Sequence, residues 1–146
     1  MNRFLGMVFL ICAVLVLGAH AAEENEEGGS IGPDKGIVEA SESKGFKLSP
    51  EALKNFDLKT QKLNGDGPWT ISKSAIVHSG EETNLFRVRS GFFKRIDFQV
   101  VKKADASLTV DSDDLREGDE IVLAGTGFLR VSELAAFGGV AHGHSH

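Results

Sequence analysis

Short apolar runs separated by glycine-containing turns fill residues 71–125, and they constrain the fold of this chain more than any other feature. Ile96, Phe98 and Val100 alternate with polar residues, which is the period-two pattern of a half-buried β-strand. The pair Ser90-Gly91 suits a tight turn with positive φ, as a hairpin between two strands requires. The stretch therefore predicts a small antiparallel β unit in which the three alternating apolar side chains are buried.

Local signals predict further elements on both sides of this unit. Ser49 is a good N-cap and Pro50 suits the first helical position, so a short helix of about two turns is expected there. Residues 58–63 and 107–110 have the composition of strands, and residues 126–137 are expected to form a short strand or turn followed by one helical turn. The predicted fold class is mainly β: a small antiparallel β-barrel or sandwich-like domain with one short N-terminal helix.

The first 21 residues are typical of a secretory signal peptide. Arg3 gives a positive start, residues 4–17 are continuously apolar, and Ala19-His20-Ala21 fits a cleavage site. The apolar run is too short and too lightly flanked to be read first as a membrane span, and an uncleaved anchor is the alternative interpretation. We therefore expect a periplasmic protein, secreted through a cleaved signal peptide, that begins near Ala22.

Composition excludes several classes of function. Cleavage would remove Cys12, the one cysteine of the chain, and would leave no disulfide and no thiol nucleophile. The net charge of −5 argues against nucleic acid or an anionic lipid surface as a partner. The sequence contains no Gly-rich phosphate loop, no metalloprotease motif and no serine–histidine–acid order in a suitable context. We therefore predict that the protein is not an enzyme.

The chain divides into a leader, an arm, one domain and a tail. Residues 1–21 are the predicted signal peptide. Residues 22–45 are acidic and rich in small residues, without the periodic apolar positions of a packed element, so a flexible arm is expected. The β domain is predicted to span residues 46–137, and a histidine-containing tail follows at residues 138–146.

Three histidines, His142, His144 and His146, alternate with small residues in this tail. Imidazole suits Zn, Ni and Cu(II), so we expect weak and exchangeable binding of such a divalent metal ion, and no other cofactor. Three nitrogens leave a tetrahedral site incomplete, so water, a carboxylate or a second chain would supply the fourth ligand. The alternative interpretation is a terminus whose histidines bind nothing specific. The acidic run Asp111-Ser112-Asp113-Asp114 departs from the EF-hand pattern and is expected to form a turn.

Four segments, taken in order, resemble a known family. They are Ser72 to Val77, Leu85 to Val88, Phe93 to Val100 and Leu115 to Gly125. The last is the most specific, because it is similar to a Leu-Lys-Glu-Gly-Asp-x-Val-Val-x-x-Gly ending. This order resembles the C-terminal, membrane-proximal domain of periplasmic adaptor subunits (membrane fusion proteins, HlyD-like) of RND-type heavy-metal efflux pumps. The Leu-Ser-Pro-Glu sequence at residues 48–51 is similar to the start of the family's conserved region.

The resemblance implies an adaptor-like domain that lacks the hairpin, lipoyl and barrel domains. A full adaptor places those domains between the two matched regions, where this chain has only residues 64–70. The implied function is that of a periplasmic accessory protein that binds the inner-membrane RND transporter or its adaptor subunit. Exposed strand edges would pair with an adaptor or with another copy of the chain as a homo-oligomer. The alternative is a free-standing periplasmic metal-binding or buffering protein whose β domain carries the tail.

Overall fold

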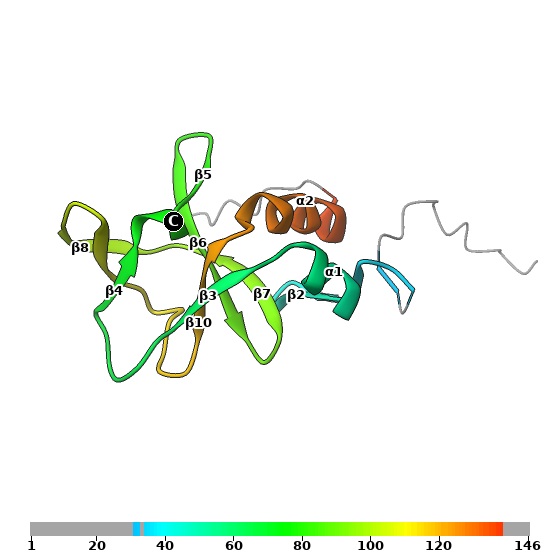
Figure 1. Ribbon diagram of the computed structural model, residues 1–146, viewed down its shortest axis with the longest axis horizontal. Helices are drawn as coiled ribbons and strands as arrows, with labels where there is room; N and C mark the ends of the chain where they lie inside the picture. The colour runs from blue at the N-terminus through cyan, green and yellow to red at the C-terminus, as the bar shows by residue number, and fades with distance from the viewer. Residues whose placement is uncertain (1–30, 33, 139–146) are drawn as a thin grey trace, which may run out of the picture.

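The computed structural model describes residues 31, 32 and 34–138 of the 146. Within this part of the chain, strands dominate and form two antiparallel sheets, with two α-helices packed beside them (Figure 1). The expectation of a mainly β domain is confirmed. Neither sheet closes on itself, so the domain resembles an open sandwich more than a barrel.

The strands are β1 (Ile37–Ser41), β2 (Gly45–Leu48), β3 (Lys59–Lys62), β4 (Trp69–Ser72), β5 (Val77–Ser79), β6 (Glu82–Arg89), β7 (Phe92–Ile96), β8 (Gln99–Lys103), β9 (Ser107–Asp111) and β10 (Glu120–Ala124). The helices are α1 (Pro50–Asn55) and α2 (Thr126–Phe137), and a 3₁₀ turn, η1, covers Lys73–Ala75. The seven-stranded sheet has the order β1-β2-β7-β6-β10-β3, with β5 also paired to β6. The three-stranded sheet has the order β4-β9-β8.

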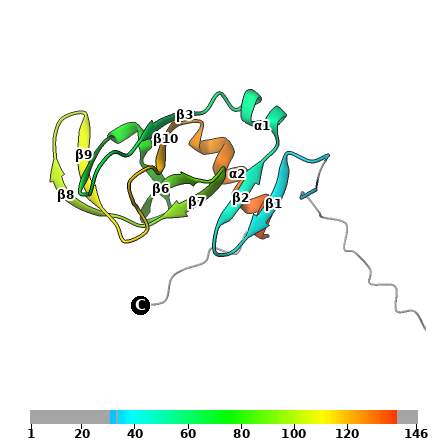
Figure 2. The same cartoon turned by 90° about the horizontal axis from the view of Figure 1, so that it is seen from below.

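Strands β6 and β10 separate two hydrophobic cores. Successive residues of these strands point to opposite faces, so Leu85 and Phe86 enter different cores, as do Ile121 and Val122. One core lies under α1, α2 and the β1–β2 hairpin, and the other lies under the three-stranded sheet. Figures 1 and 2 show that the three-stranded sheet stands at one end of the domain and the β1–β2 hairpin at the other.

The hairpin and helix signals of the sequence are confirmed. Ser90 and Gly91 have φ of 53° and 78° and join the paired residues Arg89 and Phe92, as in a type I′ turn. The Ser49 side chain accepts a hydrogen bond of 3.2 Å from the backbone N–H of Ala52, so Ser49 caps α1 as expected.

The prediction of one continuous strand through Ile96, Phe98 and Val100 is wrong. β7 ends at Ile96 and β8 begins at Gln99, because the chain leaves the seven-stranded sheet here and joins the smaller one. Ile96 is buried, Phe98 is half-buried, and Val100 is 41% exposed. An alternating pattern of apolar and polar residues cannot reveal such a change of sheet, because its interpretation assumes that the whole segment is one strand with one buried face.

Two further expectations need correction. Residues 37–45 do not belong to a flexible arm: β1 lies there, and Ile37 is 4% exposed within the first core. Residues 126–137 form the whole of α2 rather than one helical turn, and Gly138 ends that helix with a φ of 69°. The predicted signal peptide and the histidines of the tail lie outside the described residues. No helix within residues 31–138 is long and apolar enough to span a membrane.

Candidate interaction surface on helix α2

The predicted metal ligands His142, His144 and His146 lie beyond the described part of the chain. Within residues 31, 32 and 34–138, no group of three or more His, Cys, Asp or Glu side chains is arranged to hold a metal ion. Metal binding by the tail therefore stays a prediction from the sequence.

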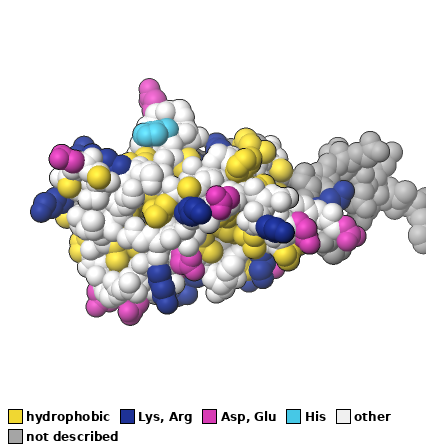
Figure 3. All heavy atoms as spheres, viewed as in Figure 1, with side chains coloured by type: hydrophobic (Ala, Val, Ile, Leu, Met, Phe, Trp, Pro, Cys, Tyr) yellow, Lys and Arg dark blue, Asp and Glu magenta, His cyan; other side chains and the backbone are white. Residues whose placement is uncertain are grey.

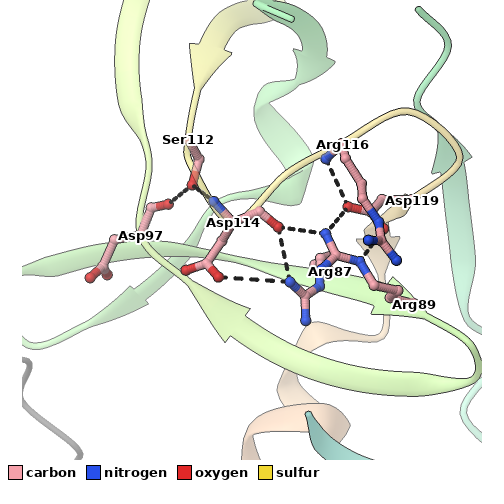
Figure 4. A network of polar contacts seen from close by, with 7 residues as sticks. All are labelled: Arg87, Arg89, Asp97, Ser112, Asp114, Arg116 and Asp119. Atoms are coloured by element: carbon pink, nitrogen blue, oxygen red, sulfur yellow. Dashed lines mark hydrogen bonds and ion pairs between the residues drawn. The ribbon is translucent and has the colours of Figure 1, made fainter. Parts of the chain in front are cut away.

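The most buried polar cluster joins β6 to the loop before β10 (Figure 4). Arg87 Nη1 donates a hydrogen bond of 2.9 Å to the carbonyl oxygen of Asp114, and Arg89 Nη2 donates one of the same length to that oxygen. Asp119 accepts two hydrogen bonds from Arg89 and a third, of 3.0 Å, from the backbone N–H of Arg116. The acidic run that begins at Asp111, the last residue of β9, thus continues into the expected turn, and the carbonyl oxygen of Asp114 anchors two arginines.

Charge in this cluster is balanced internally. Burial alone would raise the pKa of Asp119, but hydrogen bonds from Arg89 and Arg116 hold that pKa below its usual value. Burial lowers the pKa of Arg87, and the nearby charge of Arg89 lowers it further. The hydrogen bond to Asp119 raises the pKa of Arg89. Among the residues that the structure describes, one polar atom of the cluster, Arg87 Nε, is buried without a hydrogen-bond partner. Because the other donors and acceptors of the cluster satisfy one another, we interpret it as an element that fixes the fold and not as a ligand site.

The charged side chains of α2 turn toward the body of the domain. Arg95 of β7 donates a hydrogen bond of 3.1 Å from Nε to Glu133 Oε1. Arg130 contacts the same Glu133 and donates a hydrogen bond of 3.0 Å to Ser79 Oγ of β5. The side chains of Arg95 and Glu133 are only 11% and 16% exposed. An ordinary surface helix directs its charged side chains toward solvent, whereas Arg130 and Glu133 of α2 contact the underlying sheet.

The outer side of α2 is entirely without charge. Its exposed residues are Gly127, Phe128, Val131, Leu134 and Ala135, which we call the α2 face. Phe128, Val131 and Leu134 are 54%, 65% and 42% exposed. Figure 3 shows hydrophobic side chains gathered on the surface over α2. Contiguous exposed apolar side chains of this kind mark interaction sites on soluble domains.

Helix α1 extends this apolar surface. The rings of Phe56, just after α1, and Phe128 stack with centroids 4.9 Å apart and an interplanar angle of 16°. Leu53 of α1 is 41% exposed. The aromatic pair therefore connects α1 to the α2 face at the N-terminal end of α2.

Two of the edge strands, β8 and β3, are poorly suited to the docking that the sequence suggested for strand edges. Edge strand β8 exposes Val100 and Val101, but its pairing with β9 contains a register shift and it ends in Lys102 and Lys103. Edge strand β3 begins and ends with lysine, and its pairing with β10 is also shifted. Bulges and lysines are common protections against edge-to-edge pairing.

The sequence reading missed the α2 face because it predicted only one helical turn there. A usable signal was present: Phe128, Val131 and Leu134 recur every three residues, Ala135 follows, and Gly138 stands where a helix-ending glycine is expected. Two consecutive alanines and a preceding Gly-Thr-Gly segment weakened the periodicity.

Comparison with protein-family models, with curated proteins and with solved structures finds no match for this chain. The functional proposal therefore depends on the α2 face and on the order of the sequence segments.

Proposed function

We propose that this protein is a periplasmic adaptor-like accessory protein of a heavy-metal RND efflux system, and that it acts as a binding module. The observation that supports a binding role is the α2 face, whose five exposed residues carry no charge. The side chains of Phe128, Val131 and Leu134 are exposed to water. Contact with a partner surface would bury them, and that burial would contribute favourable free energy to binding.

The proposed partner is the inner-membrane RND transporter or its adaptor subunit. The support for this class of partner is the resemblance of four ordered segments to the membrane-proximal domain of heavy-metal adaptors. In this chain those segments contribute strands to both cores, so the resemblance concerns the framework of the domain and not a loop alone. The α2 face lies on this framework and supplies the contact area.

Affinity capture from detergent-solubilised envelope tests the proposal with three proteins: the wild type, Val131→Glu and Val101→Glu. The two valines are 65% and 58% exposed, so neither substitution removes core packing, but only Val131 lies on the α2 face. We expect the wild type and Val101→Glu to recover an RND component and Val131→Glu to lose it, because a buried unpaired carboxylate opposes association.

Two results would contradict the proposal. Recovery of no RND component by any of the three proteins would remove the proposed partner. Equal recovery of that component by all three would show that docking uses another surface.

Metal buffering is a second candidate function, favoured by the spacing of His142, His144 and His146. Their imidazoles suit Zn, Ni and Cu(II), and the tail needs no folded partner to bind these ions weakly. If no RND component is captured while metal binding persists, this function becomes the better account of the chain.

A further inference from the structure

The α2 face has an internal order that bears on what it contacts. Gly127, Val131 and Ala135 are spaced by four residues, so they form one row of small side chains along the outer side of the helix. At about 100° per residue, Phe128 and Leu134 stand on opposite sides of this row and at equal distances along the axis from Val131. The face is thus a shallow strip of small side chains with one bulky side chain on each flank.

This arrangement is complementary to itself. A twofold axis beside Val131, perpendicular to both helices, reverses the direction of the helix and keeps each flank on its own side. It would therefore place Phe128 of one copy against Ala135 of the other, and Leu134 against Gly127. Each bulky side chain then meets a small residue of the other copy, as a ridge fits into a groove. Small residues in the central row allow two helices to approach at the short end of the usual range of about 8–10 Å.

The charges of α2 permit such a contact. Arg130 and Glu133 are already held by Ser79 and Arg95, so covering the face would leave no charged group without a partner. An antiparallel arrangement also opposes the two helix dipoles favourably. The net charge of −5 on each chain opposes association at long range, and salt screens that repulsion.

A lipid surface fits the face less well. Helices that lie in a membrane interface carry several Lys or Arg residues on their polar side. Helix α2 has one cation, Arg130, and it is paired with Glu133. A second copy of the same chain supplies an uncharged strip of matching shape.

We propose that two copies of this protein associate through their α2 faces, as an antiparallel helix pair about a twofold axis, and so cover the face until another partner displaces one copy. The dimer itself is independent of the proposed efflux partner, and only its displacement by that partner rests on the proposed function. A helix of 12 residues is about 18 Å long, so the contact is smaller than the roughly 1,200 Å² of stable complexes. A reversible, concentration-dependent dimer is therefore expected.

Sedimentation equilibrium of the purified protein, without any partner, tests the dimer. The wild type and Val101→Glu should show the same monomer–dimer equilibrium, and added salt should strengthen it. Val131→Glu and Val131→Lys should each raise the dissociation constant at least about tenfold, because the twofold axis brings two like charges together. An equimolar mixture of Val131→Glu and Val131→Lys should associate again, because opposite charges then meet at the axis.

A wild type that stays monomeric at every concentration and salt level would overturn the dimer while leaving the capture experiment meaningful. A wild-type dimer that both Val131 variants retain would assign the association to another surface. Failure of the mixed variants to associate, when each is folded by circular dichroism, would overturn the twofold arrangement. Capture of an RND component by a protein that never dimerises would separate the two proposals.

Discussion

Arg89 donates hydrogen bonds to both carboxylate oxygens of Asp119: Nε lies 2.7 Å from Oδ1, and Nη2 lies 2.7 Å from Oδ2. The side chain of Asp119 is only 2% exposed. This contact joins the end of β6 to the residue just before β10, a neighbouring strand in the sheet, and the two residues lie 30 apart in the sequence. A bidentate contact of this kind fixes orientation as well as proximity.

Replacing Asp119 with Asn should lower the free energy of unfolding by about 1.5–3 kcal/mol at neutral pH. The folded-state pKa of Asp119 is lowered, so its contribution is present above the unfolded-state value of about 3.9 and is lost as pH falls through the lower folded-state value. The difference between wild type and variant should be constant above about pH 5 and shrink below about pH 4. Urea unfolding over a pH series measures it, and a difference that persists undiminished at pH 2 would contradict this account.

Phe46→Ala should cost about 3–5 kcal/mol of unfolding free energy. Phe46 is 1% exposed and contacts Phe86 edge-on and Phe93 in a stack, with centroids 6.4 and 5.9 Å away. Val100→Ala is the matched control: Val100 is 41% exposed, so its replacement should cost less than about 0.5 kcal/mol. Chemical denaturation measures the unfolding free energy of both variants. A larger loss for Val100→Ala would indicate that Val100 is buried, as the continuous strand predicted from the sequence required.

Gly45→Ala should prevent folding or lower the free energy of unfolding by more than about 3 kcal/mol. Gly45 has a φ of 100°, and a Cβ there would lie 2.0 Å from the carbonyl oxygen of Phe93. The control is Gly80→Ala, where φ is 64° but the added Cβ meets nothing within 4 Å. That variant should lose only about 1–2 kcal/mol of unfolding free energy, which is the cost of placing a residue with a Cβ in the left-handed conformation. Thermal unfolding compares the two, and equal losses would show that the contact with β7 is not the cause.

The tail should bind Zn, Ni or Cu(II) weakly above about pH 6.5 and lose them as its imidazoles become protonated. Titration calorimetry of the wild type and of a variant with His142, His144 and His146 all replaced by Ala measures this. His78 serves as the internal control, because it is an exposed histidine of β5 outside the tail and is kept in both proteins. Equal heats of metal binding from the two proteins would show that the three histidines of the tail do not bind these ions.

The protein recovered from the periplasm should begin near Ala22. This follows from the charged start, the apolar run and the Ala19-His20-Ala21 sequence of the first 21 residues. N-terminal sequencing of periplasmic material is the measurement. An intact Met1 in that material would favour the uncleaved anchor instead.

Local chemistry made part of the fold predictable. Ser49 and Pro50 predicted α1, and Ser90-Gly91 predicted a hairpin, because a helix cap and a tight turn depend only on residues a few positions away in the sequence. The burial of Ile37 and the exposure of Val100 were not predictable in this way. Both depend on which strands become neighbours: β1 is held by its pairing with β2, and β8 departs for a second sheet.

The candidate surface was harder to predict than the fold. Recognising it requires knowing that Arg130 and Glu133 point inward, and their partners lie far away in the sequence: Arg95 is 38 residues from Glu133 and Ser79 is 51 residues from Arg130. Without those contacts, a helix with one cation and one anion looks like an ordinary half-exposed helix. Only the folded arrangement leaves its outer side without charge.

The two cores on either side of β6 have a consequence for strand register. A strand with one apolar face resists a slip of one residue, because the slip would move its apolar side chains into water. On β6 a slip of one residue would bring Arg87 to the place of Phe86 in one direction, or Asn84 to the place of Leu85 in the other. Either slip would put a polar side chain into one of the two cores, so the adjacent pair Leu85 and Phe86 opposes a slip in both directions. The turn at Ser90-Gly91 and the contact of Arg89 with Asp119 hold the same alignment at the end of the strand.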